Sequence, residues 1–105
     1  MYVRNVKVKL RAHSVSEFRR LLRQRVIPLL RTQKGFRDEI TLISPQGNEA
    51  IAISFWDHED NADAYNHVAY LDVLRVLSKV VESVPIVETL EVAESTLRES
   101  AASTA

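Results

Sequence analysis

Two kinds of hydrophobic spacing follow one another along this chain, and their order constrains the fold more than any other feature. Residues 2–11 have apolar side chains at every second position, which is the period of a strand with one buried face. From Val15 onward the apolar side chains recur every three or four residues, which predicts a helix. We expect Pro28 to kink or end this helix, because proline lacks the N–H and clashes with the preceding turn, and we expect Gly35 to stop it.

The second half of the chain places two strands before its helix. Residues 36–44 and 50–56 alternate like strands, and the sequence PQGN between them predicts a hairpin turn. From His58 to Val84 there is no Gly or Pro, which predicts one long helix whose apolar stripe is Tyr65, Val68, Leu71, Leu74, Leu77 and Val81. Pro85 ends that helix, and residues 86–92 alternate again as a last strand.

This order predicts an α+β domain with the ferredoxin-like βαββαβ topology. The right-handed crossover rule then gives an antiparallel four-stranded sheet with both helices on one face. We assign residues 1–94 to this domain. Residues 95–105 are small and polar, and we predict that they form a flexible C-terminal tail.

The two faces of the predicted sheet differ in character. We expect Ile51, Ile53 and Phe55 to face the helices, so that alternation turns Trp56 toward the opposite face or the strand edge. The opposite face would then carry mixed polar and apolar side chains: Asn5, Lys7, Lys9, Arg37, Glu39, Thr41, Thr89 and Glu91 with Val3, Ile43 and Val87. Such a face either contacts solvent or packs against a second copy of the chain with its charges paired.

Composition excludes several classes of function. Lys plus Arg and Asp plus Glu number 14 each, so no overall charge favours nucleic acid or an anionic membrane as a partner. The absence of cysteine removes disulfides, thiolate metal sites and cysteine nucleophiles. The N-terminus MYVRNVKVKLRAH has no continuous apolar region and reads as neither a signal peptide nor a membrane anchor. We therefore expect a cytoplasmic protein.

Acidic residues gather where the second helix should begin. Asp57 and Asp60 have capping-box spacing with Glu59 between them, and negative charge stabilises a helix N-terminus. Ser14 and Glu17 have the same spacing at the first helix. The sequence after His58 lacks the second histidine that a zinc-binding helix places four residues further on. We therefore interpret the cluster as a helix cap and predict no metal site.

Three segments together resemble a known family. The sequence GFRDEITL follows a proline-interrupted first helix, the strand AISFWD leads into HEDNADAY, and the chain continues to VPIVETLEV. Over residues 2–93 this resembles the antibiotic biosynthesis monooxygenase family of dimeric α+β barrels. The resemblance implies a homodimer whose two sheets pack into one barrel, with a pocket in each subunit between helices and sheet. It also implies cofactor-independent oxygenation of a small aromatic molecule, so we expect no cofactor.

One branch of that family degrades haem, and the resemblance allows its residues to be compared. Asn5 lies where that branch has an asparagine on the first strand. Its tryptophan and histidine on the second helix correspond to Tyr65 and Arg75 here. Haem degradation is therefore not expected.

Five residues are candidates for a site. His67 near its unperturbed pKa would take a proton from a phenol or enol, forming the electron-rich anion that reacts with oxygen. Tyr65, Tyr70 and Trp56 would hold the aromatic ring, and Asn5 would orient a substrate carbonyl. Three of them have a plainer interpretation: His67 on the solvated side of the helix, Trp56 as an interface or edge aromatic, and Asn5 as a polar member of the face that carries Lys7 and Lys9.

The function expected from this reasoning is that of a cofactor-independent monooxygenase acting on a small aromatic or quinol-like compound. A non-catalytic homodimer of the same fold that binds or senses a small molecule is the alternative, since fold does not fix function. A pocket between helices and sheet that contains a titratable group favours chemistry, whereas a ligand site between subunits without such a group favours sensing. A dimer whose pocket is filled by side chains would have no cavity of ligand size.

Overall fold

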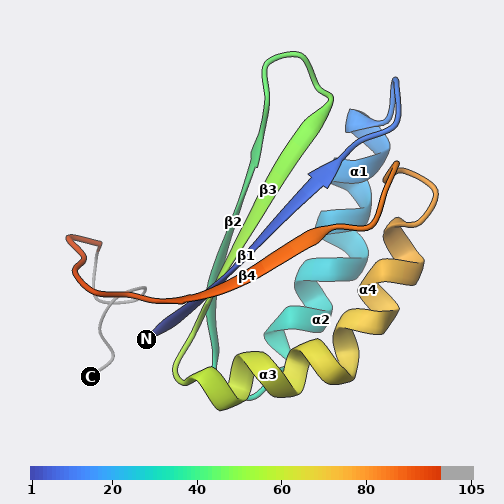
Figure 1. Cartoon of the computed structure of the whole chain (residues 1–105). Coiled ribbons are helices and arrows are strands. Elements are labelled where there is room, and N and C mark those ends of the chain that lie inside the picture. Colours follow the sequence, from blue (N-terminus) through green and yellow to red (C-terminus); the bar gives the residue numbers. More distant parts are fainter. Residues whose placement is uncertain (98–105) are drawn as a thin grey trace.

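The four predicted strands form one antiparallel sheet in the computed structural model, which describes residues 1–97. The strands are β1 (Tyr2–Lys9), β2 (Phe36–Ile43), β3 (Glu49–Trp56) and β4 (Ile86–Glu91), in the spatial order β2-β3-β1-β4. All helices lie on one face of this sheet (Figure 1). The ferredoxin-like α+β prediction is therefore confirmed. Residues 98–105 of the predicted tail lie outside the described residues, and residues 95–97 form neither helix nor strand.

The first helical segment runs through Pro28 with a local change in its hydrogen bonding. It consists of α1 (Val15–Leu21), the π-helical turn η1 (Leu22–Val26) and α2 (Ile27–Arg31). At the end of η1 the N–H of Ile27 bonds to the carbonyl of Leu22, five residues back. Pro28 lies in the first turn of α2, directly after η1, and it has no N–H to give to the carbonyls of the preceding turn. The predicted irregularity at Pro28 is thus a single wide turn before it.

The second helical segment is two helices and not the single one predicted over residues 58–84. They are α3 (Glu59–His67) and α4 (Ala69–Leu77), and the chain bends between them at Val68, with φ −124° and ψ −75°. Figure 1 shows α3 crossing one end of the sheet while α4 runs alongside it. The bend rotates the inward face, so Val68 and Leu71 of the predicted stripe are 72% and 51% exposed.

The helix N-termini also differ from prediction. Ser14 is the N-cap of α1, but its side chain makes no cap hydrogen bond, and Glu17 instead bonds to Arg20 at 2.6 and 2.8 Å. His58 is the N-cap of α3, again without a side-chain bond, while the Asp57 carboxylate accepts a hydrogen bond from Arg37 Nε. Neither capping box forms, and the Glu17 and Asp57 carboxylates are each paired with an arginine instead.

The central strand β3 presents the opposite faces from those predicted. Its pairing with β1 sets Arg4 beside Ser54, Val6 beside Ala52 and Val8 beside Ala50, and these residues face the helices. Trp56 lies on the same side and is fully buried. The larger Ile51, Ile53 and Phe55 therefore lie on the open face of the sheet, which reverses the prediction for this strand.

A β-bulge between Phe36 and Asp38 reverses the parity of β2 as well. Phe36 pairs with Trp56 on the helix side, whereas Asp38 pairs with Phe55 on the open side. We define the open face as the side chains that the registers set on this side: Val3, Asn5, Lys7, Lys9, Asp38, Ile40, Leu42, Glu49, Ile51, Ile53, Phe55, Ile86, Glu88 and Leu90. The expected positions of Asn5 and Lys7 are confirmed. Six residues predicted for the open face instead belong to the helix side: Glu39, Thr41, Ile43, Val87, Thr89 and Glu91. The open face is mostly apolar.

Gly35 links α2 to β2 at a point where a side chain has no room. Its φ is +80°, and a Cβ there would lie 2.2 Å from Asn61 Oδ1. Its carbonyl accepts the N–H of Asp57 at 2.8 Å. The predicted stop is therefore fixed by backbone conformation and by the close approach of α3. None of the helices in residues 1–97 is long and apolar enough to cross a membrane.

Candidate active site

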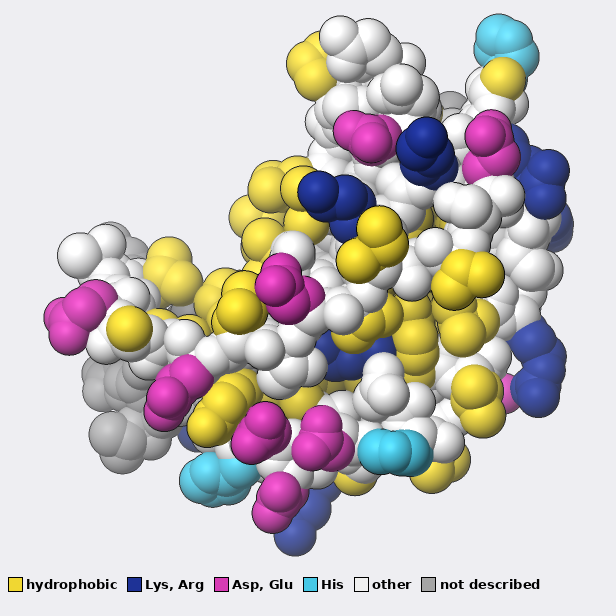
Figure 2. All heavy atoms as spheres, viewed as in Figure 1, with side chains coloured by type: hydrophobic (Ala, Val, Ile, Leu, Met, Phe, Trp, Pro, Cys, Tyr) yellow, Lys and Arg dark blue, Asp and Glu magenta, His cyan; other side chains and the backbone are white. Residues whose placement is uncertain are grey.

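A cavity of about 360 Å³ lies between the helices and the sheet. It exists because β3 contributes only the small side chains of Ala52 and Ser54 to this layer. Most of its wall is apolar and comes from β1, from the helices α1, η1, α2 and α4, and from the segment that joins α4 to β4. Figure 2 shows the hollow between β4 and α4, surrounded by hydrophobic side chains, with a basic side chain visible inside.

The basic side chain that lines this cavity is Arg4, and it is 2% exposed. Its Nη2 donates to Asn66 Oδ1 at 2.6 Å, while its Nε has no hydrogen-bond partner. Within residues 1–97 no carboxylate lies within ion-pair distance of it. Burial lowers the pKa of the Arg4 guanidinium from its usual value, with the neighbouring Tyr65 and Tyr70 acting in the other direction. Arginine keeps its proton in proteins, so the cavity contains a buried positive charge without a negative partner.

Two tyrosines stack against this guanidinium. The guanidinium carbon of Arg4 lies 4.1 Å from the ring centroid of Tyr70 and 5.0 Å from that of Tyr65. In a straight helix, residues five positions apart point about 140° away from each other. The bend at Val68 removes that difference, so both rings line the cavity. These contacts are cation–π interactions that stabilise the buried charge in part.

Both phenols are held in their protonated form. Burial raises the pKa of Tyr65 well above the usual tyrosine value, and burial also raises the pKa of Tyr70, with the Arg4 charge opposing it. The Tyr70 hydroxyl is buried and has no hydrogen-bond partner. At neutral pH Tyr70 is therefore a free hydrogen-bond donor and not a base.

Glu39 supplies a carboxyl group to the same cavity. It lies on β2 beside Ser54, which in turn lies beside Arg4, so the three residues form one row across the sheet. The Thr41 hydroxyl donates to its Oε2. Burial raises the pKa of Glu39, and the Thr41 hydrogen bond opposes this. A carboxylate in such a place is a stronger proton acceptor than an ordinary surface glutamate.

Trp56 lies behind the cavity wall. Its ring centroid is 5.2 Å from that of Tyr65 and 5.6 Å from that of Phe36. Its Nε1 donates to Ser54 Oγ at 2.9 Å, which fixes that hydroxyl at the cavity surface. The tryptophan therefore supports Tyr65 and Ser54, and it does not itself line the cavity.

The structure brings together some of the residues predicted for a site and separates others. Tyr65 and Tyr70 line the cavity, with Trp56 directly behind Tyr65. Asn5 lies on the open face, on the other side of the sheet. His67 is exposed at the end of α3, where its Nδ1 lies 2.7 Å from the carbonyl of Asp63. This is the solvated position that was the plainer interpretation of His67.

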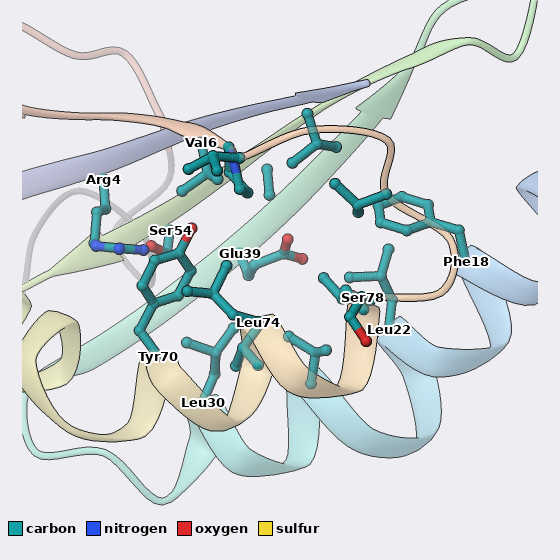
Figure 3. A pocket seen from close by; sticks show the side chains of 18 of the residues that line it. Arg4, Val6, Phe18, Leu22, Leu30, Glu39, Ser54, Tyr70, Leu74 and Ser78 are labelled. Atoms are coloured by element: carbon teal, nitrogen blue, oxygen red, sulfur yellow. The ribbon is translucent and has the colours of Figure 1, made fainter. Parts of the chain in front are cut away.

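Arg4 and Glu39 were missed by sequence reasoning. Arg4 has the same parity as the buried Val6 and Val8, so its place on the inward face of β1 could have been found by alternation. Glu39 gave no comparable signal, because the bulge at Phe36 and Asp38 changes the parity of β2. Figure 3 shows Arg4, Ser54 and Tyr70 at one end of the cavity, Glu39 near its middle and Phe18 at the other end.

The described residues offer no site for a metal ion. No group of three His, Cys, Asp or Glu side chains in residues 1–97 is arranged to bind one. The polar groups that reach the cavity are instead suited to holding an organic molecule, and they include one buried cation, one free hydroxyl donor and the two carboxyl groups of Glu39 and Glu82.

Comparisons with known proteins agree with this architecture. The family model described as antibiotic biosynthesis monooxygenase matches residues 1–75. SnoaB, a cofactor-independent oxygenase from Streptomyces nogalater, superposes with a TM-score of 0.76 at 13% identity, covering 92% of this chain and 97% of SnoaB. Rv0793 from Mycobacterium tuberculosis gives 0.71 at 18% identity, covering 91% and 98%.

A third similar structure is NE2512, a protein of unknown function from Nitrosomonas europaea. It has a TM-score of 0.75 at 13% identity, and the match covers 92% of this chain and 93% of that one. At such identities the likeness establishes the fold alone. No curated protein matches the sequence significantly.

Proposed function

The chain belongs to the antibiotic biosynthesis monooxygenase family, and from this premise we propose that it oxygenates a small aromatic or quinol-like compound without a cofactor. The substrate would bind in the cavity between the helices and the sheet. The observation that carries the proposal is the presence of a half-buried carboxyl, Glu39, on the wall of an otherwise largely apolar cavity.

The cavity favours chemistry over the alternative functions. A dimer whose pocket is filled by side chains would lack a space of about 360 Å³, which is within the range of small-molecule sites. A sensing dimer with its ligand between subunits would not need a titratable group beneath the helices. Glu39 is such a group, and it lies on the pocket wall and away from the open face.

The proposed reaction begins with proton removal. Glu39 takes a proton from an acidic C–H or O–H of the substrate, which leaves an electron-rich anion in an environment that excludes most water. The anion reduces dioxygen directly. When a ring CH₂ becomes a carbonyl, one oxygen atom enters the carbon and the other leaves as water with the two hydrogens, so no external reductant is needed. Tyr65 and Tyr70 hold the ring in place.

The open face supports the homodimer expected for this family. Ile40, Leu42, Ile86 and Leu90 are exposed there, and Ile51, Ile53 and Phe55 are half-buried between them. An apolar surface of this extent on a sheet is characteristic of an interface. We propose that a second copy covers it, which would leave each cavity inside its own subunit.

Oxygen uptake tests the proposed activity. The purified protein is mixed with anthrone and hydroquinone compounds, and oxygen consumption is compared with that of the Glu39→Gln variant. We expect uptake by the wild type and a loss of about 100-fold or more in the variant. His67→Ala is the control, because its ring bonds only to its own helix, and we expect its rate to be unchanged. Equal rates for wild type and Glu39→Gln would contradict the role of Glu39.

A further inference from the structure

The Arg4 end of the cavity contains a positive charge that the protein does not neutralise. The side chain is 2% exposed, and its polar contact is with the neutral amide of Asn66. Burying an ion without a counter-ion costs more than burying a pair, because the solvation energy lost is not regained. Stacking on Tyr65 and Tyr70 offsets only part of this cost.

Two hydrogen-bond donors meet at this end without acceptors. Arg4 Nε and the Tyr70 hydroxyl are both buried and unpaired, and both residues line the cavity. Figure 3 shows the two side chains beside each other next to Ser54. Buried donors in folded proteins are nearly always paired, so the pair points to a ligand acceptor that reaches both.

The charge of that acceptor follows from the charge of the donors. A neutral carbonyl would complete the hydrogen bonds but leave the guanidinium without a counter-ion. An ionised oxygen does both, and hydrogen bonds between ions are about twice as strong as neutral ones. The geometry therefore favours a carboxylate, phenolate or enolate oxygen.

The acidic side chains of the cavity define the orientation of such a ligand. Glu39 lies two strands away from Arg4, about 10 Å between Cα atoms at the usual strand spacing. Glu82 lines the cavity on the segment after α4. Both would repel an anionic oxygen, so the charged end of the ligand lies at Arg4 and its ring extends along the apolar wall toward Phe18.

We propose that the cavity is specific for an anionic aromatic compound, whose ionised oxygen is bound by Arg4 Nε and the Tyr70 hydroxyl. The inference rests on the proposed function in taking this cavity as the substrate site, but it concerns the charge of the ligand and not its oxidation. An aromatic acid or an enolised aromatic ketone has the required chemistry. Neutral aromatic hydrocarbons and neutral aromatic amides do not have it.

Binding of two matched probes tests this inference without any turnover. By isothermal titration calorimetry, 2-naphthoate and 2-naphthamide are compared, since they share a ring and differ in charge. We expect the carboxylate to bind the wild type at least about tenfold more tightly, as expected for a hydrogen-bonded charge pair. Arg4→Met should abolish this preference. Arg37→Met is the control, because Arg37 pairs with Asp57 outside the cavity, and it should keep the preference.

A second variant covers the case in which Arg4→Met does not fold. Tyr70→Phe removes one hydroxyl and keeps the ring, and we expect it to reduce the preference for naphthoate several-fold. Equal binding of the two probes, or no binding of naphthoate up to its solubility limit, would overturn the inference. So would a preference that survives in folded Arg4→Met. Naphthoate has no oxidisable CH₂, so a failure of the oxygenation proposal would leave these outcomes unaffected.

Discussion

The guanidinium carbon of Arg4 lies 4.1 Å from the ring centroid of Tyr70, and both side chains carry a buried polar atom without a partner. One residue comes from β1 and the other from α4, so the contact joins the sheet to the helix layer. It forms only because the chain bends at Val68.

The first prediction concerns the amide that contacts Arg4. Asn66→Asp places a carboxylate where the amide oxygen now accepts from Arg4 Nη2 at 2.6 Å. We expect the free energy of unfolding to rise by about 1 kcal/mol, since a hydrogen bond becomes a charge-assisted one at a partly solvated position. Binding of 2-naphthoate should weaken, because the new carboxylate neutralises the charge that the ligand would use. Chemical denaturation and calorimetry measure the two effects, and tighter naphthoate binding would contradict the expectation.

The second prediction concerns cavity volume. Ala52→Leu places a larger side chain where β3 now leaves space in the cavity. We therefore expect binding of 2-naphthoate to be lost. The fold should tolerate the change, because the added atoms enter a cavity and do not displace packed neighbours. Ala64→Leu, the same substitution on the exposed side of α3, is the control and should bind as the wild type does. Unchanged binding in Ala52→Leu would move the ligand site elsewhere.

The third prediction is a pH dependence from Glu39. Burial raises the pKa of this carboxyl in the folded protein above its value in the unfolded chain. The folded state therefore binds the proton more tightly, so this contribution to stability is present at low pH and is lost as pH rises through the folded pKa. Glu39→Gln should unfold at a higher temperature than the wild type at pH 7, and the difference should shrink as the pH is lowered. Thermal unfolding across pH measures this.

The same group should control activity in the opposite sense. If Glu39 is the base, kcat/KM should fall as pH drops through its raised pKa, because only the carboxylate accepts a proton. A pH profile that is flat through the acid range, with activity present, would remove Glu39 from the proposed mechanism.

The fourth prediction separates two reasons for glycine. Gly35 and Gly47 both have positive φ, at +80° and +75°. A Cβ on Gly47 would lie 3.0 Å from Val15 Cγ2, whereas one on Gly35 would lie 2.2 Å from Asn61 Oδ1. Gly47→Ala should cost about 1 kcal/mol of unfolding free energy, from backbone strain. Gly35→Ala should cost about 1–3 kcal/mol more, from overpacking. Urea denaturation measures both losses. Equal losses of unfolding free energy in the two variants would mean that the contact with Asn61 is relieved without cost.

The fifth prediction concerns assembly. Ile53 lies in the middle of the open face, beside Ile40 and Asn5 in the neighbouring strands. Ile53→Glu should convert the proposed dimer to a monomer, because an unpaired charge at the centre of an apolar interface is strongly unfavourable. Leu71→Glu, a charge placed on an exposed apolar residue of α4, should remain dimeric. Native mass spectrometry distinguishes the two states, and a monomeric wild type would refute the proposed interface.

The sequence was sufficient to predict the order of strands and helices because each pattern is local. Val6 and Val8 of β1 alternate with lysines, so their inward face was assigned correctly. The effect of Pro28 was also predictable, since the missing N–H depends only on residue type. The single π-turn that accommodates it was not, because that turn depends on how η1 packs in the helix layer.

The faces of β3 could not be assigned from the sequence, because hydrophobicity alone does not determine which face is buried in a single chain. Ile51, Ile53 and Phe55 are larger than Ala50, Ala52 and Ser54, and this size difference predicts that they are the core residues. The structure instead puts the small residues under the helices, where they leave a cavity. The large residues then lie on the open face. A local sequence pattern gives no information about a cavity beneath the helices or about a second copy of the chain on the open face.

Alternate residues of strand β3 therefore determine two separate properties, the size of the cavity and the surface of the open face. Even-numbered residues such as Ala52 and Ser54 determine the volume of the cavity. Odd-numbered residues such as Ile51 and Ile53 determine what the open face can bind. Because the strand period is two, a change at Ala52 or Ser54 leaves the surface of Ile51 and Ile53 intact. Evolution, or a protein engineer, can thus alter the size of the accepted ligand by point substitutions without disturbing assembly.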